Sequence, residues 1–84
     1  MPLIYIGKSG NKKILITSYC ERRLRQRSLS FKEVLYVLAH RHGSYPIDED
    51  GRQKIRGTLL NGKKAFLTIL EDSKKVIVIT GGEA

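Results

Sequence analysis

Two adjacent helices are predicted by the order of apolar and polar positions between residues 18 and 38. The capping-box pattern Ser-x-x-Glu occurs there twice, starting at Ser18 and at Ser30, and each serine is expected to cap the N-terminus of a helix. In the second helix, the apolar residues follow the i, i+3, i+4, i+7 spacing of a stripe that packs on a core: Phe31, Val34, Leu35 and Leu38. The first helix is rich in arginine, so we expect the second helix to anchor the core.

Short apolar runs on either side of the helices predict strands. Residues 3–6 and 13–17 are separated by a segment rich in turn-forming residues, which favours a small hairpin, although the first run is equally compatible with a loosely attached arm. Residues 75–80 are apolar at both alternating positions. Such a strand is normally covered on both faces or lies at the centre of a sheet.

A second hairpin is predicted between these segments. Alternation with period two begins at Arg52, and the dipeptide Asn61-Gly62 is a strong signal for a tight two-residue turn. A loop of that length fixes the register of the two strands. The expected cross-strand pairs are Gly57–Phe66, Arg56–Leu67, Lys54–Ile69 and Arg52–Glu71.

The predicted register assigns the side chains of this hairpin to two faces. The face against the helices is expected to carry Ile55, Leu59 and Phe66. The other face is expected to carry Lys54 and Arg56 beside Leu67 and Ile69. A row of cations over an apolar floor suits a single-stranded nucleic acid, so Lys54, Arg56 and also Lys64 are candidate contacts. The alternative is an amphipathic strand whose charged face is only solvated.

Together these elements predict one α+β domain over residues 1–84, with two N-terminal helices packed on one face of an antiparallel sheet of three to five strands. Residues 1–13 contribute either a short strand or an arm. Gly43 is the expected left-handed cap that ends the second helix, which leaves His40 and His42 at a solvated helix end.

The charge of the chain gives the first indication of a partner. Its 84 residues include 16 Lys and Arg against 8 Asp and Glu, a formal net charge of +8. A polyanion is favoured because each cation that neutralises a phosphate releases counterions. The local cluster of negative charge, residues 48–50, is expected in a turn. Solubility alone is the alternative explanation of the positive excess.

Several classes of protein are disfavoured by composition. Cys20 is the single cysteine, which excludes an internal disulfide and fits a reducing cytoplasm. With only two histidines, a zinc site would need carboxylates to complete it, so no metal or cofactor is expected. No apolar run approaches the roughly 18 residues of a membrane span. The expectation is a cytoplasmic protein of thin core, with an open site rather than a deep cleft.

The first helix offers a second set of candidates. Tyr19, Arg23 and Arg27 recur every four residues and therefore share one helix face. They are candidate nucleic-acid contacts, with a structural alternative in which the arginine stems pack over the second helix and the guanidinium groups bond Glu33 or helix-end carbonyls.

Part of the chain resembles a known family. Residues 16–34, Ile-Thr-Ser-Tyr-Cys-Glu-Arg-Arg-Leu-Arg-Gln-Arg-Ser-Leu-Ser-Phe-Lys-Glu-Val, resemble the opening of a bacterial and phage family of small domains of uncharacterised function, written Ser-His-Ala-x-x-Arg-x-x-x-Arg-x-Ile-Ser-x-x-Glu-Val. The Asp-Gly-Arg at 50–52, the strand with Gly57 and the closing Val-Ile-Val-Ile-Thr also resemble it. The resemblance covers about residues 14–80, in order.

That family is similar to the RelE/ParE/BrnT-like toxin superfamily. The similarity implies two helices on an antiparallel sheet and, in several relatives, cleavage of messenger RNA. Arg23 and Arg27 match the motif arginines, whereas Tyr19 stands in place of the motif histidine, and tyrosine does not replace imidazole as a proton carrier near neutral pH. Gly81-Gly82 follows the last strand where ribonuclease relatives often place tyrosine or histidine. Membership therefore does not imply catalysis.

Three functions stay open at this stage. The first is a metal-independent endoribonuclease of the toxin type, with candidate catalytic residues Lys54 and Arg56 for the phosphate and Arg23 or Tyr19 nearby. The second is a non-catalytic module that binds RNA, DNA or the ribosome through the same residues. The third is a protein-interaction domain whose basic surface pairs with an acidic, antitoxin-like partner.

Overall fold

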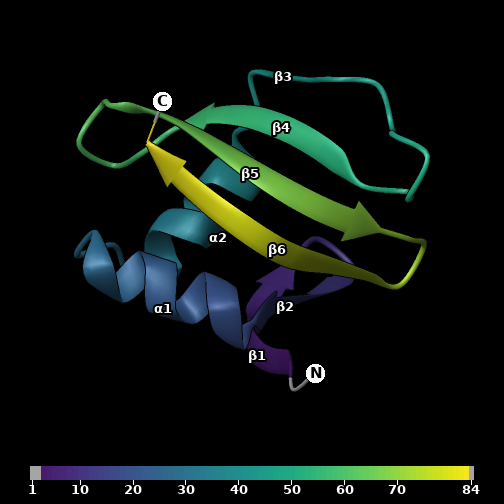
Figure 1. Cartoon of the computed structure of the whole chain (residues 1–84), viewed down its shortest axis with the longest axis horizontal. Coiled ribbons are helices and arrows are strands. Elements are labelled where there is room, and N and C mark those ends of the chain that lie inside the picture. Colours follow the sequence, from purple (N-terminus) through teal and green to yellow (C-terminus); the bar gives the residue numbers. More distant parts are fainter. Residues whose placement is uncertain (1–2, 84) are drawn as a thin grey trace.

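The N-terminal apolar runs form a hairpin, as predicted, and not an arm. In the computed structural model, which describes residues 3–83, β1 (Leu3–Ser9) pairs antiparallel with β2 (Lys12–Thr17). Of residues 1–13, for which a short strand or an arm was predicted, residues 1 and 2 lie outside this range. The hairpin leads directly into α1 (Ser18–Gln26), which is followed by α2 (Phe31–Ala39) (Figure 1).

The N-terminus of α1 is capped by Thr17 and not by Ser18. The Thr17 hydroxyl oxygen accepts a hydrogen bond from the Cys20 backbone N–H at 3.0 Å, and the hydroxyl donates to the Ile79 carbonyl oxygen at 2.8 Å. The first bond satisfies one of the free amides at the helix start. The second ties α1 to the last strand, so the capping box predicted at Ser18 is wrong by one position.

The start of α2 is where the sequence predicts it, but the capping box does not form. Ser30 is the N-cap residue, yet its side chain makes no capping hydrogen bond. The carboxylate of Glu33 instead accepts from the Leu60 backbone N–H at 3.1 Å. The helix ends at Ala39 with His40 as its C-cap, and Gly43, the predicted cap, lies in a strand.

The sheet has six strands and is mixed, which corrects the prediction of an antiparallel sheet of three to five strands. The second half of the chain adds β3 (Gly43–Ser44), β4 (Gln53–Thr58), β5 (Lys64–Glu71) and β6 (Lys75–Glu83). The strand order is β1-β2-β6-β5-β4-β3. β2 and β6 are parallel, because the helices and the meander supply the long connection that a parallel pair needs. β6 lies inside the sheet, as its apolar sequence predicts.

The β4–β5 register differs by one residue from the predicted register. Arg56 pairs with Phe66 and Gly57 with Ala65, so the predicted pairs, including Arg52–Glu71, are wrong. The connection runs from residue 59 to residue 63 and is longer than a two-residue turn: Leu59 N–H donates to the Lys63 carbonyl oxygen at 2.8 Å. A one-residue change of register moves the side chains of β5 to the opposite face relative to those of β4.

The core joins the helices to one set of alternating strand positions. Its strand residues are Ile14, Ile16, Ile55, Leu59, Ala65, Leu67, Ile69, Val76 and Val78. Its helix residues are Cys20, Leu24, Val34, Val37 and Leu38. Of the predicted stripe, Phe31 is 38% exposed and Leu35 is only partly buried. Phe66, Ile77 and Ile79 are half-buried and lie outside the core, contrary to the prediction for Phe66.

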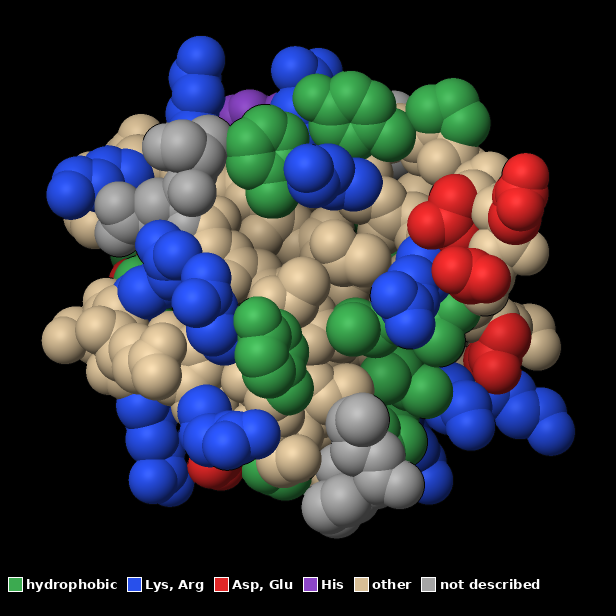
Figure 2. Space-filling view, in the orientation of Figure 1, with side chains coloured by type: hydrophobic (Ala, Val, Ile, Leu, Met, Phe, Trp, Pro, Cys, Tyr) green, Lys and Arg blue, Asp and Glu red, His purple; other side chains and the backbone are tan. Residues whose placement is uncertain are grey.

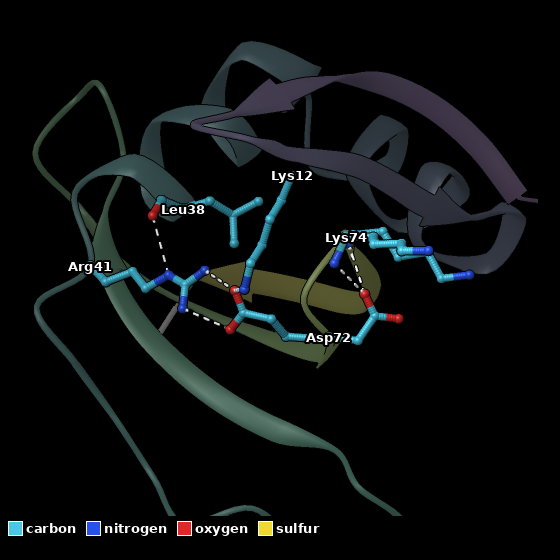
Figure 3. Close-up of polar contacts among 7 residues, drawn as sticks. Lys12, Leu38, Arg41, Asp72 and Lys74 are labelled. Carbon is cyan, nitrogen blue, oxygen red and sulfur yellow. Dashed lines mark hydrogen bonds and ion pairs between the residues drawn. The ribbon is translucent and has the colours of Figure 1, made fainter.

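A charged network holds the two halves of the sheet to the end of α2 (Figure 3). The carboxylate of Glu71 accepts from Lys12 Nζ at 3.0 Å and from both terminal nitrogens of Arg41 at 3.2 Å. Arg41 also donates from Nε to the Leu38 carbonyl oxygen at 3.2 Å. The hydrogen bonds from Arg41, and then those from Lys12, hold the pKa of Glu71 below its ordinary value.

Candidate nucleic-acid interface

The predicted basic residues of β4 lie on the face of the sheet opposite the core, here called the outer face. Ile55 is fully buried in the core, so its neighbours Lys54 and Arg56 point the other way and are exposed. On β5, Leu67 and Ile69 are buried, which places Phe66 on the outer face beside these cations. The sequence correctly predicts that Lys54 and Arg56 lie on the outer face. It is wrong about their neighbours on β5, because Phe66 lies there in place of Leu67 and Ile69.

Cations and aromatic rings alternate on this surface. The Lys54 ammonium lies 5.0 Å from the centre of the Phe66 ring, and the Arg56 guanidinium lies 5.8 Å from the centre of the Tyr45 ring. The two rings are 6.4 Å apart with an interplanar angle of 36°. Both distances from cation to ring fall within the range of cation–π contacts. We call Tyr45, Lys54, Arg56, Lys64 and Phe66 the aromatic–basic site.

The backbone of β3 and the segment after it brings Tyr45 to the site. Tyr45 N–H donates to the Lys54 carbonyl oxygen at 2.9 Å, and the amide of Gln53 donates to the Tyr45 carbonyl oxygen at 3.1 Å. Tyr45 is 45% exposed. Its ring is therefore held on the sheet while one side stays open to solvent.

An open hollow of about 280 Å³ lies at one end of the site. It is lined by His42, Arg56, Gly57, Lys64, Ala65 and Phe66. Its charged groups are cations, and the Phe66 ring supplies an apolar wall. An anionic group is the ligand that this lining favours.

His42 lines this hollow, although the sequence prediction did not include it among the site residues. Its backbone N–H donates to the Arg56 carbonyl oxygen at 2.9 Å, and its Nε2 lies 3.0 Å from the Thr58 hydroxyl oxygen. The sequence predicts His42 at a solvated helix end. The pairing with β4 could not be predicted, because a two-residue strand is too short to show an alternating pattern of apolar and polar residues. Histidine is the side chain that most readily exchanges protons near neutral pH.

The candidates on the first helix lie apart from this site. α1 contributes Cys20 and Leu24 to the core and packs against β2 and β6, whereas the β4 cations lie on the outer face. Tyr19 is 48% exposed. In the described part of the chain, Arg23 Nε is buried without a hydrogen-bond partner.

Arg27 reaches the C-terminal part of β6. A Cβ added to Gly82 would lie 3.4 Å from the Arg27 guanidinium carbon, and Gly82 pairs with Phe66. The Arg27 guanidinium group is thus one strand away from the aromatic–basic site. The structure brings Lys54, Arg56 and Lys64 together, with Arg27 at their border and Tyr19 and Arg23 elsewhere.

Charge is unevenly distributed over the molecule. Figure 2 shows Lys and Arg side chains next to hydrophobic side chains on the face displayed, with most of the visible acidic side chains at its right border. The exposed loop before β4 carries Asp48, Glu49 and Asp50, and the Asp48 carboxylate accepts from the backbone N–H groups of Asp50 and Arg52. The acidic loop therefore disfavours a polyanion that passes beyond the start of β4.

Other kinds of site find little support among residues 3–83. No group of three or more His, Cys, Asp or Glu side chains in that range is arranged to hold a metal ion. Burial raises the pKa of the Cys20 thiol to about 11, which keeps it protonated and unreactive. Neither helix in the described range has the length and apolar character to cross a bilayer.

Comparison with known proteins gave no relative from which to transfer a function. Scans against protein-family models, curated proteins and solved structures each found no match. The geometry of the site is therefore the basis for assigning a function.

Proposed function

We propose that this protein binds single-stranded RNA through the aromatic–basic site. The observation that carries the proposal is the placement of Lys54 over the Phe66 ring and of Arg56 over the Tyr45 ring. Single strands are bound where bases stack on aromatic rings while cations contact the adjacent phosphates. Stacking contributes about 1–3 kcal/mol per base by alanine substitution, and each phosphate contact adds a salt-dependent part.

The alternative, a merely solvated strand, accounts for the cations but not for the rings. Solvation of a charged strand does not by itself account for Tyr45, which is 45% exposed, and the half-buried Phe66 lying against those cations. Rings held between cations on a sheet are the arrangement that favours unpaired bases. This pattern also favours a single strand over a duplex, in which the faces of the bases are stacked and inaccessible.

We also propose that the fold is of the RelE/ParE/BrnT-like toxin type, with both helices on the core face of the sheet and the cytoplasm as its site of action. The support is the motif resemblance together with the order of elements, in which two helices precede a meander of four strands. The expected target is then messenger RNA or ribosome-associated RNA.

Ribonuclease activity is the stronger form of this proposal. The ribose 2′-hydroxyl would attack the adjacent phosphorus, the bond from phosphorus to the 5′-oxygen would break, and a 2′,3′-cyclic phosphate would form. His42 is the candidate to accept the 2′-hydroxyl proton, and the leaving oxygen would take a proton from water. Arg56 and Lys64 line the same hollow and would stabilise the charge on phosphorus oxygens.

The binding test uses fluorescence anisotropy with a labelled single-stranded RNA of about 12 nucleotides, within the size range of single-strand sites. The double variant Lys54→Gln, Arg56→Gln should bind more weakly. Its plot of log K against log salt should be shallower by about 1.4, because single strands contribute about 0.7 per phosphate contact. A matched control, Arg22→Gln with Lys32→Gln, removes two exposed charges from the helices. Equal behaviour of the two double variants would remove the site from consideration.

Cleavage is tested separately by incubating the protein with total RNA in the presence of a chelator. His42→Ala should abolish cleavage with little loss of binding. If the His42→Ala variant still cleaves RNA, His42 is not the proton acceptor. If the wild-type protein leaves the RNA intact, the protein binds RNA without cleaving it.

A second candidate function, pairing with an acidic antitoxin-like protein, is supported by a groove beside α2. It has an open volume of about 510 Å³ and is lined by Lys8, Ser9, Gly10, Lys32, Leu35, Tyr36, Ala39 and Leu60. Apolar side chains with lysines at the border fit an acidic segment with apolar anchors. Absence of nucleic-acid binding by the wild-type protein at low salt would favour this function.

A further inference from the structure

Four lysines converge at the end of the sheet away from the β4–β5 loop. Lys8, Lys13, Lys74 and Lys75, with Asn11 and Ser73, line an open hollow of about 420 Å³ between the β1–β2 turn and the β5–β6 turn. We call these four residues the lysine cluster. Each is exposed, and none forms a salt bridge with another described residue.

The nearest acidic groups compensate the cluster only in part. Glu71 is bonded to Lys12 and Arg41. The Asp72 carboxylate accepts from the backbone N–H groups of Lys74 at 2.7 Å and Lys75 at 2.9 Å, as seen in Figure 3, and these bonds, with a smaller contribution from the Lys75 charge, hold its pKa below the ordinary range. Asp72 therefore offsets part of the charge of Lys75, and four lysines face one acidic group that is not already in an ion pair.

Two members of the cluster stand directly opposite each other. Lys13 pairs with Lys75 across the parallel β2–β6 ladder. Their neighbours Ile14 and Val76 are buried, so both lysines point to the outer face, the face of the aromatic–basic site. Like charges in such a cross-strand pair destabilise a sheet. A bound anion would offset the repulsion between these two lysines. If this face were only solvated, the pair would lower stability with no function to explain it.

The outer face between the two basic regions is neutral. It carries Leu15, Thr68, Leu70 and Ile77, all of them half-buried. Two strand spacings of about 4.8 Å, and about five residues of about 3.3 Å along β6, put roughly 19 Å between Lys54 and Lys75. A strand of several nucleotides is needed to reach from one basic region to the other.

We infer that the lysine cluster is a second phosphate-binding site, which holds the same RNA strand after it has crossed the neutral outer face from the aromatic–basic site. This inference rests on the proposed function. It makes affinity depend on the length of the RNA.

The test compares two single-stranded oligouridylates, of about 4 and about 12 nucleotides, because sites on small domains span about this range. The double variant Lys13→Gln, Lys75→Gln should bind the short RNA as the wild type does. It should bind the long RNA several-fold more weakly, with a salt slope shallower by about 1.4. The control is again Arg22→Gln with Lys32→Gln, and thermal unfolding of each variant checks the fold.

The outcomes separate this inference from the proposed function. If Lys54→Gln, Arg56→Gln weakens both RNAs while Lys13→Gln, Lys75→Gln matches the control on the long RNA, the aromatic–basic site stands and the lysine cluster is rejected. If the wild-type protein binds neither RNA at low salt, the proposed function fails. Equal loss of short and long RNA in the lysine variant would also overturn the inference, since the short RNA should not reach both regions.

Discussion

Arg56 lies directly across the β4–β5 ladder from Phe66. This pair places an aromatic ring on the outer face of the sheet among Lys54 and Arg56, and not in the core beneath α2. A shift of one residue would exchange Phe66 for Leu67 and leave the cations over an aliphatic floor. The proposal of base stacking therefore depends on this pairing.

The rings of the aromatic–basic site should contribute affinity without contributing salt dependence. Phe66→Leu or Tyr45→Leu is expected to weaken single-stranded RNA binding by about 1–3 kcal/mol for each base that loses its stacking partner. The salt slope should not change, because no phosphate contact is removed. Anisotropy titrations at several salt concentrations measure both quantities.

Tyr19→Leu is the matched control for these aromatic variants, since Tyr19 is 48% exposed on α1, away from the aromatic–basic site. It should leave RNA binding unchanged. An equal loss of affinity in the Tyr19 variant would show a general effect of removing exposed rings and would argue against stacking at the site.

The close approach of α2 and β4 depends on Gly57. A Cβ at this position would lie 2.6 Å from Cγ1 of Val37, so Gly57→Ala should destabilise the fold by about 1–3 kcal/mol. Val37→Ala removes the clashing methyl group, and the double variant should be less destabilised than the sum of the single variants. Urea unfolding of the four proteins measures this coupling. Strict additivity would mean that the two residues do not touch.

Thr17 and not Ser18 should be the sensitive position at the start of α1. Thr17→Val keeps the shape but removes the bonds to Cys20 and Ile79, with an expected loss of about 1–2 kcal/mol in unfolding free energy. Ser18→Ala should change stability by less than about 0.5 kcal/mol. The reverse order of the two denaturant midpoints would restore Ser18 as the cap.

Glu71 should make stability depend on acid pH. Its pKa is lowered in the folded protein from the ordinary value of 4.5, because Arg41 and Lys12 favour the charged carboxylate. The stabilisation is therefore fully present above pH 4.5 and is lost as pH falls through the lower folded pKa. The difference in unfolding free energy between the wild type and Glu71→Gln should shrink between neutral pH and about pH 3.

Glu49→Gln controls for the loss of one negative charge, because Glu49 is exposed in the loop before β4. Urea midpoints of the three proteins across this pH range provide the comparison. A constant difference between wild type and Glu71→Gln at all pH values would show that the ion pairs with Arg41 and Lys12 do not stabilise the fold.

Local patterns in the sequence predict the elements of the fold better than their contacts. The two helices, the first hairpin and the interior position of the last strand follow from periodicity and turn residues. The caps were misassigned because Thr17 and Ser18 are adjacent hydroxyl residues, and the choice between them depends on the distant Ile79 carbonyl. Glu33 likewise bonds the amide of Leu60 and not its own helix cap.

Only part of the candidate site could be predicted, because local patterns indicate strand faces but not the contacts between strands. Lys54 and Arg56 were found because strand alternation is local. The neighbours of these cations depend on the hairpin loop, where Gly62 has a φ of +86° and the Asn61 side chain accepts from the Lys63 N–H at 2.9 Å. The dipeptide Asn61-Gly62 predicts a two-residue turn but lies in a longer loop in the structure.

The remaining members of the site come from long-range pairing. His42 and Tyr45 reach the outer face only because their amides donate to the Arg56 and Lys54 carbonyl oxygens. A strand as short as β3 has no periodicity from which this pairing could be read.

The most direct measurement is an NMR titration of the labelled protein with single-stranded RNA, followed through backbone amide shifts. The account predicts that the largest shifts lie on the outer face at Tyr45, Lys54, Arg56, Lys64 and Phe66, and that they diminish as salt is raised. Shifts confined to α1, around Tyr19 and Arg23, or to the groove beside α2, would contradict it.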